Sequence, residues 1–179
     1  IYLDCDNDST STRNYYLVLH RGSVDINKSI YFSLSAYERI KTSSVNVSIS
    51  GTASNKGNSS ISMSGVDSSV ISVNLTNDTK IPNKAIVTRI SSSGTQSPSQ
   101  GNVHHMVMPA SNGNWYTSTV SSASSGHYNI DIDDGIPVKQ KWSFKYNALA
   151  TAKSTMRNVK LTIEFQYDLH DTDYETYIR

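Results

Sequence analysis

The feature that most constrains the fold is an uninterrupted period of two near the carboxyl terminus, VKLTIEFQYDL, from Val159 to Leu169. Apolar residues occupy every second position, and polar residues occupy the positions between them. Because successive side chains of a β-strand point to opposite faces, this pattern predicts a long strand with one buried face. We expect Ile163 and Phe165 to lie at the centre of the core that this face forms.

Shorter runs with the same period recur along the chain. They lie at residues 45–50, 71–76, 128–132 and 142–146. Turn-forming stretches separate the runs, among them NDTKIPN, SSSGTQSPSQGN, PASNGN and DDGIP. The best helix candidate is SAYERIKTS, residues 35–43, which is equally compatible with an irregular edge strand. Since no long amphipathic helix is available to cover a sheet, a second sheet must do so. The sequence therefore predicts an all-β fold, a single antiparallel β-sandwich of the jelly-roll type, with at most one or two short helices.

Hydroxyl side chains are abundant, with 31 Ser and 15 Thr among 179 residues, and the hydrophobic share is only 36%. Disordered chains are poor in aromatic residues and strongly charged, whereas this chain has 11 Tyr and a net charge of +1. We therefore predict one folded domain, residues 15–179, preceded by a polar arm, residues 1–14. Cys5 is the single cysteine, so it is either a passenger or part of an intermolecular disulfide.

The chain begins with Ile rather than Met, which a removed signal peptide or a boundary chosen for expression would explain. No apolar run approaches the roughly 18 residues of a membrane span. Because Ser-, Thr- and Asn-rich all-β chains are frequent outside cells, we expect an extracellular or cell-surface location.

Three stretches in the second half resemble the closing half of the P-domain-type jelly rolls that accompany subtilisin-like proprotein convertases. They are IVTRISSSG, HHMVMPASNGNW and KWSFKYNALATAKSTMRNVKLTIEF. The matching features are an apolar strand entering Met108, Pro109, Ser111 and Gly113, a strand led by Trp142, and a long closing strand. The likeness runs from about Ile86 to Tyr167, and it implies a β-sandwich with an accessory role.

Clustered acids offer candidate metal sites. DCDND holds Asp4, Asp6 and Asp8, but it lacks the glycine and glutamate that an EF-hand loop needs. The better candidate is DIDDG, in which Asp131, Asp133 and Asp134 follow an apolar run and precede a turn. Calcium is the cation that such carboxylates favour, and an ordinary turn is the alternative. HDTDYE adds a weaker set, His170, Asp171, Asp173 and Glu175.

Three further chemistries find little support. His104 and His105 are adjacent on an expected strand, so they point to opposite faces and cannot easily share a metal. Lys141 and Lys145 fall on the face opposite Trp142, and the net charge is only +1, so we expect no nucleic-acid partner. The chain holds no G-x-S-x-G, H-E-x-x-H or P-loop motif, and we predict a non-catalytic protein.

The least ordinary feature is a segment poor in charge. Between Asp78 and Asp131 there is no acidic residue. Surfaces depleted in charge and rich in aromatic residues are suited to contacts. Within this segment, the loop NGNWYTS carries the candidate ligand-binding residues Asn112, Asn114, Trp115 and Tyr116.

Two functions follow from these patterns. The first is a secreted or surface-exposed binding or adhesion module, with Trp115 and Tyr116 as anchors for a carbohydrate or protein ligand. Alternatively, Trp115 simply fills the end of the sandwich. The second function is a self-assembling structural subunit of a surface filament or viral shell, in which the arm and Cys5 reach a neighbouring copy.

Overall fold

The computed structural model describes residues 40–58, 64–99, 103–119, 128–133 and 135–169, together with 16, 18, 20, 22–23, 25–29, 31 and 33. The chain divides into two compact units, Ile1–Ala36 and Tyr37–Arg179. In the first unit, the Lys28 amide donates to the Asp25 carbonyl at 3.0 Å, closing a turn. The predicted arm and its boundary at residue 14 lie outside the described residues, as does Cys5.

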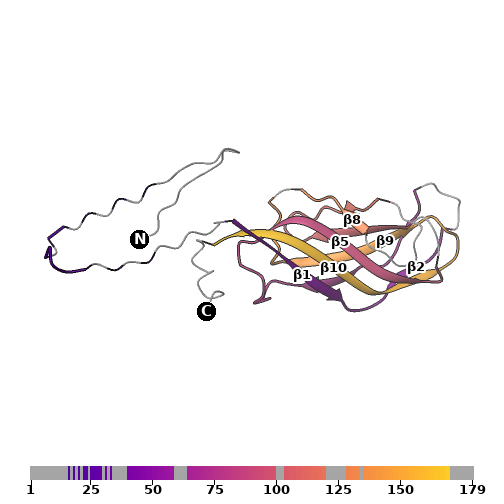
Figure 1. Ribbon diagram of the computed structural model, residues 1–179. Coiled ribbons are helices and arrows are strands. Elements are labelled where there is room, and N and C mark those ends of the chain that lie inside the picture. Colours follow the sequence, from indigo (N-terminus) through magenta and orange to yellow (C-terminus); the bar gives the residue numbers. More distant parts are fainter. Residues whose placement is uncertain are drawn as a thin grey trace. The chain divides into compact units, whose positions relative to one another are not determined.

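The second unit is a sandwich of two antiparallel sheets. The first sheet has the order β1 (Ile40–Ile49), β10 (Ser154–Asp168), β5 (Ile86–Ser97) and β8 (Tyr128–Ile130), and β2 (Ala53–Asn55) also pairs with β10. The second sheet has the order β3 (Val66–Asp67), β9 (Lys141–Ala148), β6 (Val103–Pro109) and β7 (Tyr116–Thr117), and β4 (Ile71–Asn74) also pairs with β9. Figure 1 shows the first sheet across the front, with β9 behind it. We call these sheet A and sheet B. The prediction of an antiparallel β-sandwich is confirmed.

The longest strand, β10, organises sheet A. It pairs with β1 over ten residues without a register shift. On its other side it pairs with β5, and the register shifts between Arg157 and Lys160. Asn158 lies in this interval with a φ of 53°, a left-handed conformation that asparagine tolerates better than most residues. The strand therefore begins five residues before the apolar alternation that predicted it, and an irregularity separates the two parts.

The core lies between the two sheets. Trp142, Phe144 and Tyr146 face inward from β9, and each has 0% of its surface exposed. Ile163 and Phe165 face them from β10, also buried, as the sequence predicted. The Trp142 indole donates to the Val138 carbonyl at 3.0 Å, so its one polar group is satisfied inside the core.

Several local predictions can be compared with the strands. Each of the four predicted runs overlaps a strand: 45–50 overlaps β1, 71–76 overlaps β4, 128–132 overlaps β8 and 142–146 lies within β9. Within SAYERIKTS, Ile40–Ser43 belong to the edge strand β1, so for these residues the edge-strand alternative is correct and the helix is wrong. The helix candidate's remaining residues, 35–39, lie outside the described part. Among the described residues, no helix is long and apolar enough to span a membrane.

One turn prediction was wrong. Most of SSSGTQSPSQGN continues β5 through Ser97 instead of forming a loop. The inward positions of this stretch are the small or polar residues Ser92, Gly94 and Gln96. They fit the interior because a neighbouring strand of the same sheet fills the space beside Gly94 and a residue of the opposite sheet bonds to Ser92. A Cβ at Gly94 would lie 2.9 Å from the Met156 sulfur, and Ser92 bonds to a buried histidine.

Candidate ligand-binding surface

The loop that carries the predicted site is a tight turn between β6 and β7. The Gly113 amide donates to the Pro109 carbonyl at 3.1 Å, and Gly113 adopts a φ of 70°, which glycine reaches without strain. The Ser111 amide donates to the Gln140 side-chain oxygen at 2.7 Å, which ties the turn to the segment before β9. Asn112 accepts the Asn114 amide at 3.0 Å. The turn is therefore fixed by the protein before any ligand arrives.

Tyr116 opens β7 and sits opposite Val107, whose side chain is buried, so its ring lies at the margin of the core. Its hydroxyl accepts a hydrogen bond from the Asn112 amide at 2.8 Å and donates one to Asp133 at 2.6 Å. The hydrogen bond to Asp133 raises the pKa of the Tyr116 phenol, so the group stays a neutral donor near pH 7. This hydroxyl joins the predicted ligand loop to the predicted metal loop.

Trp115 faces the other way. Because neighbouring residues of an extended chain alternate, Trp115 lies on the outer face of sheet B, where the Lys145 ammonium is 4.4 Å from the centre of its ring. A cation at this distance is attracted to the face of an indole. Trp115 is partly buried, but the cation–π contact is with an outward-facing residue of β9. The alternative that Trp115 fills the end of the sandwich is not what the geometry shows.

An ion pair fixes Lys145 in turn. Its ammonium bonds to a carboxylate oxygen of Asp67 on β3, and the other oxygen of Asp67 accepts the Asn147 amide at 2.7 Å. Partial burial would raise the pKa of Asp67, but the hydrogen bonds from Lys145 and Asn147 outweigh this effect and lower it. Asp67, Lys145 and Trp115 thus form a row that crosses sheet B.

Two methionines extend the same face. Met106 lies opposite Lys145 in the ladder, and Met108 lies opposite Ser143, so both share the outer side with Lys145. Both are half-buried. Thioethers are polarisable and adapt to differently shaped partners. We define the Trp115 surface as Asp67, Met106, Met108, Trp115 and Lys145.

The four residues predicted to bind a ligand do not form one flat patch. Asn112 and Asn114 are exposed on the turn, Tyr116 points toward Asp133, and Trp115 lies over sheet B. The sequence analysis did not identify Lys145 or Asp67 as part of the site. The alternation of β9 placed Lys145 on an outer face, but no local signal connects it with Trp115 or with Asp67, which is 78 residues away.

The metal candidates stay predictions. Asp131 and Asp133 are both exposed on the loop after β8, and Asp133 accepts the hydrogen bond from the Tyr116 hydroxyl. Asp134 lies outside the described residues, as do Asp4, Asp6, Asp8, His170, Asp171, Asp173 and Glu175. Within the described ranges, no three His, Cys, Asp or Glu side chains gather as a metal site would require.

The two adjacent histidines separate as predicted. His105 is fully buried, whereas His104 lies on the outer side of β6. The charge-poor segment is likewise divided, since β5 belongs to sheet A and β6 and β7 belong to sheet B. It therefore does not form a single neutral contact face.

Comparisons with known proteins identify one clear relative. The chain is 48% identical over 169 residues to the uncharacterized protein YbdN of Bacillus subtilis (strain 168), covering 94% of this chain. The chain spans 58% of the length of that relative. No family model matches the chain, and the resemblance to P-domain-type modules stays a prediction.

Two solved structures are distantly similar. A mud crab tombus-like virus structure shares 8% identity over 94% of this chain and 100% of its own, with a TM-score of 0.38. A family two carbohydrate esterase from Cellvibrio japonicus shares 7% identity over 72% of this chain and 36% of its own, with a TM-score of 0.31. Similarity at this level carries no argument about function.

Proposed function

We propose that this chain is a non-catalytic binding module of the cell exterior, and that it contacts a protein ligand through the Trp115 surface. The observation that supports this most is the row Asp67–Lys145–Trp115, which holds an indole on the outer face of a sheet next to two half-buried methionines. Tryptophan and methionine are enriched where proteins meet, and tryptophan often carries much of the binding energy.

Preorganisation supports the same proposal. Ordering a side chain at an interface costs about 0.5–1.5 kcal/mol of binding free energy. The ion pair and the cation–π contact already order Lys145 and Trp115 in the unbound protein. The turn before Trp115 is fixed by hydrogen bonds from Gly113 and Ser111. A ligand therefore meets a surface that requires little rearrangement.

A carbohydrate is the second candidate ligand. Asn112, Tyr116 and Asp133 form a connected set of hydrogen-bonding groups on the exposed side of the turn. Such groups fix the orientation of a polar ligand, while a neighbouring aromatic ring supplies apolar contact. The calcium that the DIDDG loop was predicted to bind would belong to this same edge.

The test compares wild type with Trp115→Ala and with Lys160→Ala, a control on the outer face of sheet A. Each is screened against a panel of purified extracellular matrix proteins and a glycan array. We expect Trp115→Ala to abolish a signal that Lys160→Ala retains, with matching thermal melts. Equal binding by wild type and Trp115→Ala would refute the assigned site. Signal confined to the glycan array would favour the carbohydrate ligand.

A further inference from the structure

The most unusual unassigned feature of the fold is the outer edge of β1. All ten residues of β1 pair with β10, and none of the other described strands pairs with the opposite edge. In an antiparallel ladder, roughly half of the backbone N–H and C=O groups of an edge strand point away from its neighbour. This edge therefore offers an extended row of main-chain donors and acceptors.

The remaining edges of the described sandwich are short. In sheet A, β8 and β2 have three residues each, and at the sides of sheet B β3 and β7 have two each and β4 has four. Short strands are one of the usual protections against edge pairing, together with proline, bulges and charged residues. β1 has ten residues, no proline and no register shift, and its single charge is Lys41 near one end. Apart from Lys41, it has none of these protections.

The side chains of β1 are compatible with pairing to a second copy of the same strand. If two β1 strands run antiparallel with Val45 opposite Val45, then Ser44 meets Asn46 and Thr42 meets Ser48. This register keeps outer residues with outer residues, whereas a shift of one residue would place Val45 opposite Asn46. Hydroxyl and amide pairs stabilise neighbouring strands, and the two Lys41 side chains lie at opposite ends.

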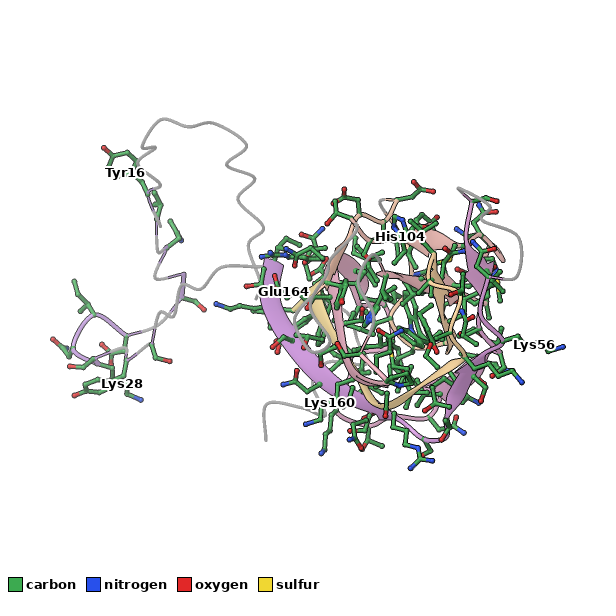
Figure 2. All side chains as sticks on the ribbon, turned by 90° about the vertical axis from the view of Figure 1, so that its right-hand side faces the viewer. Tyr16, Lys28, Lys56, His104, Lys160 and Glu164 are labelled. Atoms are coloured by element: carbon green, nitrogen blue, oxygen red, sulfur yellow. The ribbon has the colours of Figure 1, made fainter. Side chains whose placement is uncertain are left out.

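Charges on the neighbouring strand lie well away from such a joint. Lys160 and Glu164 of β10 lie beside Ser48 and Ser44 on the outside of sheet A (Figure 2). Across the joint, Glu164 of one copy lies one row from both Lys160 and Glu164 of the other, about three strand spacings to the side, or roughly 14 Å. At this distance salt screens attraction and repulsion alike, so these charges neither favour nor oppose the joint. The joint would also cover Ile40, whose exposed fraction is 44%, and the half-buried Val45.

We propose that β1 pairs antiparallel with β1 of a second copy, in the register that places Val45 opposite Val45, and joins two copies of sheet A into one continuous sheet. The pairing follows the two-fold symmetry of most homodimers, because the same strand is used by both partners. It does not depend on the Trp115 surface, which lies on sheet B. It supplies a contact for the self-assembly considered as the alternative function, and it would present two Trp115 surfaces to a multivalent ligand.

The test uses two double variants of the full chain that differ at one position. In Ser44→Lys/Asn46→Lys, each new lysine faces a lysine of the partner. In Ser44→Lys/Asn46→Glu, each faces an opposite charge. Both positions are exposed, and both variants lose the same Thr162–Asn46 hydrogen bond, so the folded monomers are matched. Sedimentation velocity over a range of concentrations measures the assembly of each chain, and thermal melts report the fold.

We expect wild type to sediment as a dimer of about 39 kDa, twice the mass of one chain. The dissociation constant should rise about tenfold or more in the lysine pair, because like charges directly opposite one another destabilise strand pairing. It should stay near the wild-type value in the lysine–glutamate pair. A wild type that is monomeric, or an oligomer that both variants leave unchanged or weaken equally, would overturn the proposal. Pairing of β1 in a different register, or with a different protein, would produce one of those outcomes.

Discussion

Protonation of His105 should destabilise the sandwich well above the pH at which carboxylates titrate. The imidazole is fully buried and stacked on Tyr128 with ring centres 3.7 Å apart, and the Phe144 ring lies perpendicular to it with ring centres 5.1 Å apart. Nδ1 bonds to the Ser92 hydroxyl at 2.9 Å, and Nε2 has no hydrogen-bond partner. The described surroundings of the imidazole are a hydroxyl and two aromatic rings, and burial lowers the pKa of His105 from 6.5 to about 3.

The direction of the effect follows from the two protonation states. The unfolded chain binds a proton on His105 near pH 6.5, while the folded chain does so only near pH 3, so protons favour the unfolded state between these values. Stability is full above pH 6.5 and falls by up to about 1.4 kcal/mol per pH unit below it. Between pH 7.5 and pH 5.0 the loss should be about 2 kcal/mol. That is a large part of the stability of an ordinary domain.

The assay is urea unfolding at half-unit steps between pH 7.5 and pH 5.0, for wild type and His105→Asn. The asparagine side chain keeps an amide near Ser92 but does not titrate. We expect His105→Asn to be less stable at pH 7.5 because it leaves a small cavity, and to lose much less stability on acidification. Parallel pH profiles for the two proteins would refute the reasoning, since groups other than His105 would then cause the loss.

Three further predictions concern packing and the ion pair. Phe165→Ala should lower the free energy of unfolding by about 3–5 kcal/mol in thermal melts, while Thr162→Ala on the outer face of the same strand should change it little; a wild-type melt for Phe165→Ala would contradict the core assignment. Gly57→Ala should lower the free energy of unfolding by about 1–3 kcal/mol more than Gly113→Ala does. Both glycines have a positive φ, but only at Gly57 would the new Cβ clash with the backbone, at the Thr151 carbonyl. Asp67→Asn should lower the free energy of unfolding above pH 4, where the wild-type carboxylate is ionised and paired with Lys145. This difference from wild type should shrink as the pH falls through the lowered pKa of Asp67. Chemical denaturation at pH 6 and pH 2 measures it, and an equal difference at both pH values would mean that the ion pair contributes nothing.

Much of the fold could be predicted because apolar and polar residues alternate along the strands that form the core. The alternation around Ile163 and Phe165 identified the buried face of β10, and that around Trp142 and Phe144 identified the buried face of β9. The second half of β5 could not be predicted, because its inward residues are small or polar. Ser92 faces inward, and its hydroxyl bonds to His105 of the opposite sheet. Such a pairing depends on sheet stacking, which no local pattern encodes.

The site was predicted only in part for a related reason. The loop was found from its composition, but the separation of Trp115 from Tyr116 follows from the pairing of β7 with β6. Lys145 reaches Trp115 from β9, and Asp67 holds Lys145 from β3, two other strands of sheet B. Their meeting depends on strand order, which the sequence alone did not supply.

Hydrogen–deuterium exchange with and without a captured ligand tests the central claim most directly. The Trp115 surface and its supporting turn lie in Met106–Thr117 and Lys141–Asn147, apart from Asp67 on β3. We expect ligand to slow exchange in these two segments and to leave β1 and the rest of sheet A unchanged. Protection confined to the outer strands of sheet A, with none around Trp115, would contradict the account.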